Sequence, residues 1–389
     1  MHSKAFKDVV HVQALSGTGI AMALVLAQIV ANTELHNLFA PLRGGLTLTM
    51  GDAALTMPAG QWISSALLTL VFLLAGLECK RGFLDGELAG PDRLRLPALG
   101  ALGGVTVPAV IHAGLNWADP ALAGAWAIPA GTDMALGLGF LALFGDRAPG
   151  SMKLLYLTTA LFMNIATLVC TAGVQFLHLP TSTLVVAGGC LALLAGMNWA
   201  RVGAFSLYAV VGGVLWGALV PLGVPAALAA LAVAAFVPMY DGERTLLAEI
   251  EQDVHRAVGF VVLPVLAFVN AGVALHELPP LVSHWSLGLG LGLFVGKQAG
   301  IFGLCWLGTR MGFCALPPGV SWLEMYGVAL LGGIGGTMSL SFGGMLGAGA
   351  APLALTRAAV LLGSMASAVV GYLVLRRALS QRRNKALRR

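Results

Sequence analysis

Long apolar segments, separated by short polar loops, follow one another along almost the whole chain. Runs of about 18 or more hydrophobic residues recur, and each is long enough to cross the hydrocarbon core of a membrane as a helix. The strict alternation of polar and apolar residues that is typical of a membrane β-barrel is absent, which favours helices. The pattern predicts about twelve transmembrane helices, at residues 13–31, 59–79, 95–116, 121–143, 150–175, 182–199, 204–220, 224–238, 254–274, 284–307, 322–349 and 354–377.

The composition supports this interpretation and excludes a soluble globular protein. Of the 389 residues, 58% are hydrophobic and 10% are charged, whereas a soluble domain carries about 25% charged residues. The five cysteines form no CxxC or Cys/His spacing, so neither a disulfide framework nor a zinc site is predicted, and no cofactor is expected. We therefore predict one all-α, polytopic membrane domain over residues 1–389, whose first helix is a retained signal anchor.

Basic residues fall on alternate sides of the predicted spans, as the positive-inside rule requires. The loops after odd-numbered spans carry Arg43 and, at a span boundary, Arg357. Both termini are basic, which predicts an even number of spans with both ends in the cytoplasm. The tail at residues 378–389 is expected to contact anionic lipid there rather than nucleic acid. The basic residues in the loops after even-numbered spans are Lys80, Arg81, Arg93, Arg95, Arg147, Lys153, Arg201, Arg244, Arg256 and Arg310.

Two charged residues lie in the middle of predicted spans, Asp133 in span four and Lys297 in span ten. A charge at that depth costs roughly 2.5–3.5 kcal/mol on insertion scales, so such residues face a partner or a water-filled cavity. Because each is alone in its sign, the two are expected to form an ion pair. This pair either locks two helices together or belongs to an ion or proton site.

Glycines interrupt spans four and eleven close to polar side chains. Paired interrupted helices indicate a transporter with inverted repeats and a site near the membrane midplane. An interruption leaves N–H and C=O groups without partners inside the helix, and Asp133 is expected to serve positive helix ends there. The residues at the interruptions that we expect to take part are Gly131, Thr132, Gly335, Gly336, Thr337 and Ser339.

The same polar residues disfavour an intramembrane enzyme. An aspartyl dyad needs two deep carboxylates, and only Asp133 is deep. A serine dyad needs a deep histidine, whereas His112 lies near the end of span three and the other seven histidines lie in loops or at span ends. The segment GLFVGKQ lacks the glycine spacing and the Ser/Thr of a P-loop. No enzymatic activity is predicted.

Five segments, in order along nearly the whole chain, resemble the NhaA family of bacterial sodium/proton antiporters. The resemblance implies a multi-pass inner-membrane protein with twelve helices and two crossed discontinuous helices, here spans four and eleven. It also implies a role in pH homeostasis and homodimers, which some members form through a hairpin after span one. Residues 42–58 alternate in polarity as such a hairpin does, although an ordered loop fits them equally. The five segments are VFLLAGLECKRG (71–82), GTDMALGLGFLALFGDRAP (131–149), LPVLAFVNAGVAL (263–275), GKQAGI (296–301) and GGTMSLSF (335–342).

The resemblance assigns roles to individual positions. Thr132 and Asp133 match the family's residues on the extended chain at the helix crossing, and Lys297 matches its membrane lysine. The residues that match part of the cytoplasmic cluster linked to pH activation are Glu78, Arg81, Glu251 and His255, with Gly82 where the family has an acid.

Span five departs from the family pattern. The two adjacent aspartates that bind sodium and exchange protons in the family fall here on Met163 and Asn164, and a further acid of span two falls on Ser65. Sodium requires oxygen ligands, and anionic ones are favoured in a low dielectric. Asp133 is then the one carboxylate that can hold either a proton or Na⁺. The Thr132 hydroxyl, the Asn164 amide oxygen and freed carbonyls can complete its shell, whereas the Met163 thioether does not favour sodium.

These observations leave two functional hypotheses. The first is an antiporter that exchanges internal Na⁺ or Li⁺ for external protons by alternating access around Asp133. The second is an antiporter-like protein that has lost cation exchange and acts as a regulator or sensor, or carries another small solute. Such a solute would be an organic anion attracted by Lys297 and by half-helix N-termini. A stable relic held together by the Asp133–Lys297 pair is a further alternative.

Overall fold

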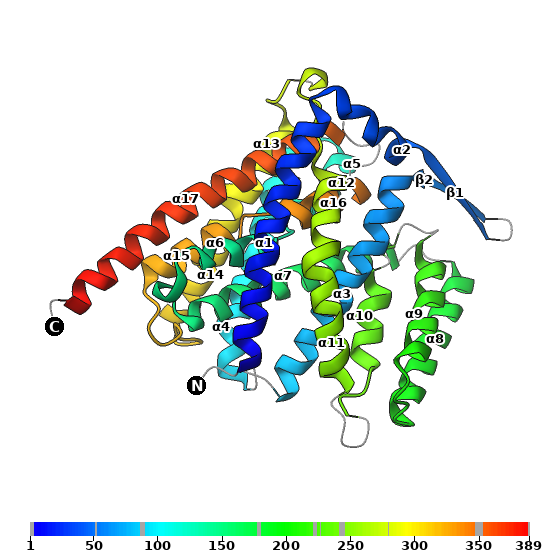
Figure 1. Ribbon diagram of the computed structural model, residues 1–389, viewed down its shortest axis with the longest axis horizontal. Coiled ribbons are helices and arrows are strands. Elements are labelled where there is room, and N and C mark those ends of the chain that lie inside the picture. Colours follow the sequence, from blue (N-terminus) through cyan, green and yellow to red (C-terminus); the bar gives the residue numbers. More distant parts are fainter. Residues whose placement is uncertain are drawn as a thin grey trace. The chain divides into compact units, whose positions relative to one another are not determined.

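The computed structural model describes residues 4–50, 53–85, 90–176, 180–220, 224–225, 227–240, 246–278, 280–346 and 353–387. It consists mostly of helices, many of them apolar, which confirms an α-helical polytopic membrane protein (Figure 1). Backbone contacts group the described residues into two compact units. The first is built from residues 1–37, 91–167 and 267–389, and the second from residues 38–90 and 168–266.

The first unit contains both helix interruptions expected from the sequence. Its long helices α4 and α14 pack against each other, α1 packs against α6, and α17 packs against α13, α15 and α16. Short turns join helices of this unit at η2 (Gly145–Arg147), η5 (Leu275–Glu277) and the π-turn η6 (Gly292–Gly296), while η1 (Glu34–Phe39) follows α1 and contains the boundary with the second unit. The helices of the first unit are α1 (Lys4–Ala31), α4 (Pro91–Leu115), α5 (Pro120–Ala123), α6 (Met134–Ala142), most of α7 (Gly150–Phe176), the second half of α12 (Leu263–Ala271), α13 (His284–Leu291), α14 (Lys297–Arg310), α15 (Trp322–Leu331), α16 (Gly336–Leu346) and α17 (Leu353–Leu387).

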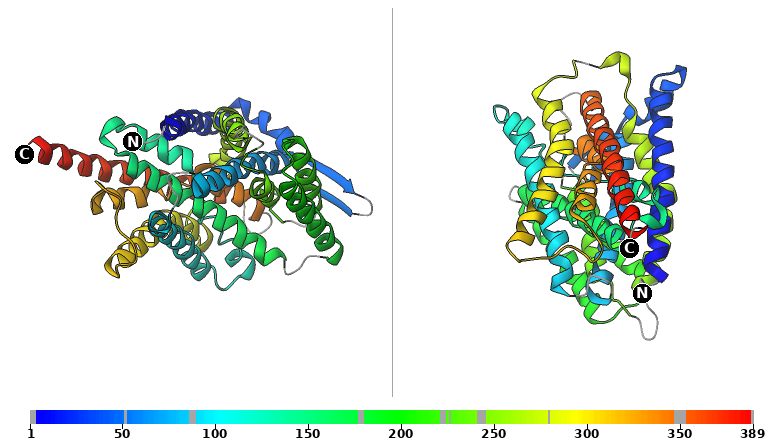
Figure 2. Two further views of the ribbon diagram at one scale, coloured as in Figure 1. Left: turned by 90° about the horizontal axis from the view of Figure 1, so that it is seen from below. Right: turned by 90° about the vertical axis from the view of Figure 1, so that its left-hand side faces the viewer.

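The second unit combines a helical layer with one β-hairpin. Strands β1 (Gly45–Met50) and β2 (Ala53–Pro58) pair antiparallel, with Thr47 opposite Thr56, and lie side by side in Figure 2. The alternating stretch 42–58 therefore contains a hairpin; residues 51–52 lie outside the described residues. Helix α3 packs against α10 and α11, and α8 packs against α9. The helices of this unit are α2 (Ala40–Arg43), α3 (Ala59–Asp85), α8 (Thr181–Trp199), α9 (Phe205–Leu219), α10 (Ala227–Phe236), α11 (Leu246–Ala257) and the π-turn η4 (Val258–Val262).

The close packing of α4 on α14 depends on glycine. A Cβ atom added at Gly103 would overlap the carbonyl of Gly300, and one added at Gly300 would overlap the carbonyl of Gly103. Small residues allow helix backbones to approach this closely inside a membrane. Polar caps fix the helix ends: the Ser321 hydroxyl accepts from the Glu324 amide, and the Glu324 carboxylate accepts from the Ser321 amide. The sequence thereby fixes where the interrupted segment α15–α16 begins.

Eight helical segments among the described residues are long and apolar enough to cross a membrane, or nine if two bent helices count as one span. They account for eight of the twelve predicted spans. The remaining four are α1, the interrupted segment α5–α6, and the helices α9 and α10 of 15 and 10 residues. Since a helix rises about 1.5 Å per residue, α9 and α10 each fall short of a hydrocarbon core of about 30 Å. The eight segments cover residues 59–84, 92–115, 150–174, 181–199, 246–271, 284–310, 322–344 and 353–382.

Candidate functional site

Two helix interruptions in the first unit contact each other through their backbones. The chain leaves helical conformation at residues 131–133, before α6, and at residues 332–335, between α15 and α16. The Asp133 amide donates to the Ile334 carbonyl at 2.6 Å, and the Thr132 hydroxyl donates to the Gly332 carbonyl at 2.9 Å. Peptide groups freed by one interruption are thus satisfied by the other, which is how non-helical backbone is tolerated at membrane depth.

Asp133 caps both half-helices that start at these interruptions. Its Oδ1 accepts from the Leu136 amide at 2.9 Å, at the start of α6. Its Oδ2 accepts from the Thr337 amide at 2.9 Å and from the Thr337 hydroxyl at 2.6 Å, at the start of α16. The carboxylate is 2% exposed, so two helix N-termini, with their partial positive charge, replace the water that it loses.

The surrounding glycine and serine positions lie against this carboxylate and its chain. Gly336 begins α16, and a Cβ added there would lie 3.3 Å from Asp133 Oδ2. The Ser339 hydroxyl donates to the Gly131 carbonyl at 3.3 Å, and the Gly335 carbonyl accepts from the Ser339 amide at 2.8 Å. The six interruption residues named from the sequence are therefore brought together at one place.

Lys297 is fully buried beside the first interruption, at 0% exposure, but it is not paired with an acid. Its Nζ donates to the Ala130 carbonyl, to the Thr132 hydroxyl at 2.8 Å and to Met163 Sδ at 3.6 Å. These three acceptors use the three protons of an ammonium group. No ion pair joins Lys297 to Asp133 among the described residues, so the predicted pair is wrong.

The helix interruptions explain why the two charges stay apart. Asp133 precedes two helix N-termini, whose amides offer partial positive charge, whereas Lys297 bonds a carbonyl on the turn that precedes the extended chain. Each charge is stabilised by backbone dipoles of the opposite sign. Formal charge alone would pair Asp133 with Lys297. In the structure, each of them is bonded to backbone groups instead.

Asn164 of α7 holds the extended chain by two reciprocal hydrogen bonds. Its Oδ1 accepts from the Thr132 amide at 3.1 Å, and its Nδ2 donates to the Thr132 carbonyl at 2.9 Å. The side chain is 2% exposed, so both ends of its amide are buried and satisfied. A carboxylate at this position would accept from the amide, but when ionised it could not donate to the carbonyl. The asparagine is therefore matched to the peptide that it binds.

Two further side chains at the interruptions were not found from the sequence. The buried Tyr156 hydroxyl, two turns before Asn164 on α7, donates to the Asp133 carbonyl at 2.9 Å. The Ser364 hydroxyl of α17 accepts from the Gly335 amide at 3.0 Å. Both lie in apolar spans in which a single hydroxyl is common, so only the three-dimensional contact reveals them.

The second unit brings together the four residues expected in a cytoplasmic cluster. Arg81 Nη2 lies 2.8 Å from Glu251 Oε1, and His255 Nδ1 lies 3.2 Å from Glu78 Oε1. Glu251 Oε2 and His255 Nε2 are buried and have no hydrogen-bond partner among the described residues. The cluster thus joins α3 to α11 and leaves two titratable atoms without a partner there. Ser65 lies on α3 as well, where its carbonyl accepts from the Thr69 hydroxyl at 2.8 Å.

Comparison with known proteins decides the family. The model of the family described as "Na+/H+ antiporter 1" matches residues 7–375. The chain belongs to this family. It is 40% identical to the Na(+)/H(+) antiporter NhaA 2 of Magnetococcus marinus over 384 residues, 95% of this chain and 97% of that protein. It is 35% identical to NhaA of Psychrobacter cryohalolentis (96% and 95% covered) and 40% identical to NhaA of Bordetella parapertussis (94% of both).

As a member of the NhaA family, the chain belongs to a class of transporters and not of enzymes. Among the described residues, its membrane site offers a cation one carboxylate instead of an adjacent pair. In the described part of the first unit, Asp133 is the carboxylate at the interruptions, and α7 contributes a thioether and an amide from Met163 and Asn164. No group of three or more His, Cys, Asp or Glu side chains among the described residues is arranged to hold a metal ion.

Proposed function

We propose that the protein exchanges internal Na⁺ or Li⁺ for external protons across a bacterial inner membrane. Membership of the NhaA family supports this activity. The contact between the two interruptions around Asp133 supports the location of the site. In this proposal α5–α6 and α15–α16 are the two crossed discontinuous helices of an inverted repeat, within twelve spans. Both termini lie in the cytoplasm, in agreement with the alternation of basic loops.

Exchange requires Asp133 to be released from at least one helix cap. The Leu136 amide and the Thr337 amide and hydroxyl use three of the roughly four acceptor sites of the carboxylate, which leaves at most one for a cation. Alternating access, in which one bundle rocks against another, separates such contacts periodically. Asp133 then binds either a proton or the cation. The carbonyls of Ala130 and Gly332 are the neutral oxygens nearest to the Thr132 hydroxyl that can complete a shell.

The positive charge of Lys297 is coupled to cation binding in this proposal. Its ammonium is bound to the Ala130 carbonyl and the Thr132 hydroxyl, two of the oxygens that Na⁺ would need. The ammonium and Na⁺ therefore compete for one set of neutral ligands. Entry of the cation requires Lys297 to move away or to lose its proton, and either event links cation binding to proton movement.

A second candidate function is that of an antiporter-like regulator, sensor or carrier of another solute. The observation in its favour is the pair of reciprocal hydrogen bonds between Asn164 and the Thr132 peptide. These bonds make α7 a structural support of the interruption, with no carboxylate that can hold a cation. Under this candidate Na⁺ and Li⁺ have no effect on proton movement at any pH.

The deciding experiment measures cation-dependent proton movement in everted membrane vesicles. A ΔpH-sensitive dye is followed while Na⁺ or Li⁺ is added between about pH 6.5 and 8.5. Collapse of the gradient in the wild type and its loss in Asp133→Asn support the antiporter. Asp119→Asn is the matched control, because Asp119 caps α5 in the same way at an exposed position. Absence of any response from inserted wild-type protein favours the second candidate.

Two auxiliary features complete the proposal. The cluster of Glu78, Arg81, Glu251 and His255 adjusts the activity to pH, because its two carboxyl groups and its imidazole are titratable and lie beside the permanently charged Arg81. The hairpin β1–β2 joins two copies of the chain into a homodimer through its free strand edges, which are unpaired in the described hairpin.

A further inference from the structure

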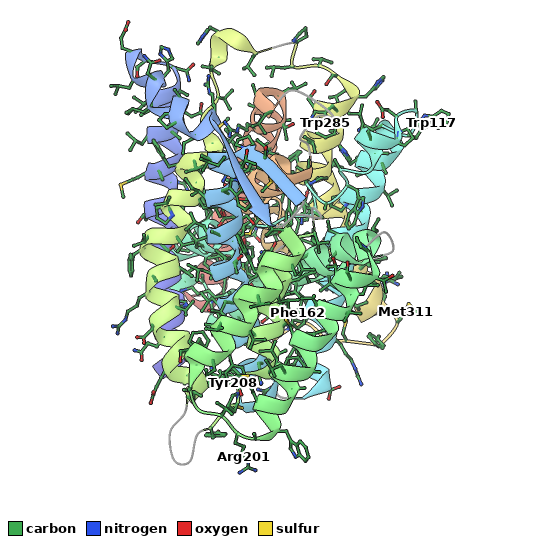
Figure 3. All side chains as sticks on the ribbon, turned by 90° about the vertical axis from the view of Figure 1, so that its right-hand side faces the viewer. Trp117, Phe162, Arg201, Tyr208, Trp285 and Met311 are labelled. Carbon is green, nitrogen blue, oxygen red and sulfur yellow. The ribbon has the colours of Figure 1, made fainter. Side chains whose placement is uncertain are left out.

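A second buried polar cluster lies in the first unit, away from the interruptions and unused by the proposed mechanism. It is formed by His112 on the last turn of α4 and by Asn116, the residue after the end of that helix, which are 0% and 3% exposed. The His112 ring packs edge-on against Trp285 of α13, with centroids 5.3 Å apart. Trp285 lies near one end of the α13–α14 segment and Met311 near the other, as Figure 3 shows.

The cluster lies toward the outer face of the membrane. Met311 follows Arg310, which belongs to the basic loops that the positive-inside rule assigns to the cytoplasm. The opposite end of the same helical segment, with Trp285, then faces outward. Trp117, one turn beyond His112, is 79% exposed at this end (Figure 3). His112 therefore lies just inside the face from which external protons enter.

The tautomer of His112 follows from its hydrogen bond. Nε2 lies 3.0 Å from the Leu122 carbonyl, which only accepts, so Nε2 carries the proton. Nδ1 of the neutral ring then has a lone pair and no partner among the described residues. Asn116 shows the same deficit: its Nδ2 donates to the carbonyls of His112 and His284, while its Oδ1 has no partner there.

One added proton would give both unpaired atoms, His112 Nδ1 and Asn116 Oδ1, a possible hydrogen-bond partner. Added at His112 Nδ1, it converts an unpaired acceptor into a donor, and Asn116 Oδ1, one helical turn away on the same face, is an unpaired acceptor. The bond from Nε2 to the Leu122 carbonyl is kept. Gly288 leaves the space: a Cβ added there would lie 2.7 Å from both His112 Nδ1 and Asn116 Nδ2.

The ionisable groups at the interruptions offer no comparable place. Both oxygens of Asp133 already accept hydrogen bonds, all three protons of Lys297 are donated, and the Tyr156 hydroxyl donates to a carbonyl. At Asp133 the helix caps already use three of the carboxylate's roughly four acceptor sites, so a proton competes with them for the oxygens. At His112 it can be added without breaking a bond.

Resting on the proposed function, we propose that His112 is a proton-binding residue of the exchange, on the outer side of the interruption that carries Asp133. Its carbonyl partner Leu122 belongs to α5, which leads through the turns at residues 124–130 into the extended chain. Protonation adds one positive charge to the His112 ring and transfers no other group. The charged or titratable side chains on the elements around it are engaged elsewhere or exposed. These are Asp119, which caps α5, His284, which is exposed, and Arg357, which donates to the Gly272 and Val269 carbonyls.

The test is a proton titration of His112 in the full-length protein in lipid, by ¹⁵N NMR with labelled histidine. His112→Gln, which keeps a donor for the Leu122 carbonyl, identifies the signal by its disappearance. We expect Nδ1 to pass from the unprotonated to the protonated form as the pH is lowered. Because linkage is reciprocal, saturating Na⁺ should lower the proton affinity of His112 about twofold or more. His284→Gln, at an exposed ring, should leave this signal unchanged.

Transport provides a readout that a purely structural role would not move. His112→Gln should slow exchange several-fold and flatten its dependence on pH, while His284→Gln keeps the wild-type profile. Asn116→Asp leaves His112 in place and sets an anion beside Nδ1, so proton binding should tighten about tenfold. An Nδ1 that stays unprotonated throughout, or a titration that Na⁺ and Li⁺ leave unchanged, overturns the inference. If the wild type still exchanges cations in that case, the proposed function stands and only the role of His112 fails.

Discussion

Met163→Asp should create the cation ligand that α7 lacks. Met163 Sδ lies 3.6 Å from Lys297 Nζ and 3.9 Å from the Thr132 hydroxyl oxygen. The Sδ of methionine and the Oδ atoms of aspartate are both two bonds beyond Cβ, so a carboxylate oxygen takes nearly the place of the sulfur. The substitution therefore sets an anion beside the buried ammonium and beside the oxygens that Lys297 now binds.

The energies indicate that the fold tolerates this change. Two unit charges 3.6 Å apart attract by about 4 kcal/mol at an effective dielectric constant of about 20. Burying the new carboxylate costs several kcal/mol, so the net effect on stability is close to zero. For Na⁺ the balance differs, because an anionic oxygen replaces a thioether. A gain of only about 1.4 kcal/mol in cation binding is a tenfold gain in affinity.

Everted vesicles measure the result. We expect Met163→Asp to show Na⁺- and Li⁺-dependent collapse of ΔpH at a cation concentration about tenfold lower than the wild type requires. Met163→Asn, which has the same shape and no charge, should not improve on the wild type. The reasoning is refuted if inserted Met163→Asp behaves as the wild type does, or if Met163→Asn gains as much.

Two further substitutions test individual contacts. Tyr156→Phe removes the hydrogen bond to the Asp133 carbonyl and should cost about 0.5–1.5 kcal/mol of stability in thermal unfolding, whereas Tyr208→Phe, whose buried hydroxyl has no partner among the described residues, should be nearly neutral. Glu251→Gln removes the anion that Arg81 Nη2 contacts at 2.8 Å, so Arg81→Gln should cost less stability in the Glu251→Gln background than in the wild type; an equal cost in both backgrounds would contradict this pairing.

The spans predicted from the sequence separate into two groups for a physical reason. Eight apolar runs form helical segments long enough to cross a membrane, and one of these, α15–α16, is interrupted at residues 332–335. In segment 121–143 the apolar run is as long, but the helix is broken between α5 and α6. A hydropathy window averages over such a break and over helix ends. It therefore detects that a segment is apolar and not how much of it is helical.

At the candidate site, the sequence pointed to residues that lie together in the structure, but it paired two of them wrongly. Thr132, Asp133, Thr337 and Lys297 were found because polar groups are conspicuous in apolar spans. The prediction that Asp133 would serve positive helix ends agrees with its bonds to Leu136 and Thr337. The predicted ion pair does not form, because the backbone amides of Leu136 and Thr337 already stabilise the Asp133 carboxylate. Partial charges at helix ends depend on where helices stop, which formal charges along a sequence do not reveal.

For the substitution Asn164→Asp, the family pattern and the structure lead to opposite expectations. Seen from the family pattern, Asn164→Asp restores a lost acid. In the structure, the ionised carboxylate of this variant would face the Thr132 carbonyl with an oxygen in place of the Nδ2 donor, now 2.9 Å away. A buried acceptor left without its donor costs about 1–3 kcal/mol. A protonated acid can still donate, so the folded state favours the protonated form.

The sign of the pH dependence follows directly. Stability that requires the protonated acid is present at low pH and is lost as the pH rises and the acid ionises. Thermal unfolding of the Asn164→Asp variant should match the wild type near pH 5.5 and show a loss of about 1–3 kcal/mol near pH 8.5. Asn32→Asp is the matched control: Asn32 also donates to a carbonyl, of Val273, and accepts from an amide, of Leu275, but it is exposed. Water can solvate an ionised acid there, so its pH dependence should be much weaker. If Asn164→Asp is as stable as the wild type at both pH values, the amide of Asn164 is not what holds the extended chain, and α7 is free to contribute a cation ligand after all.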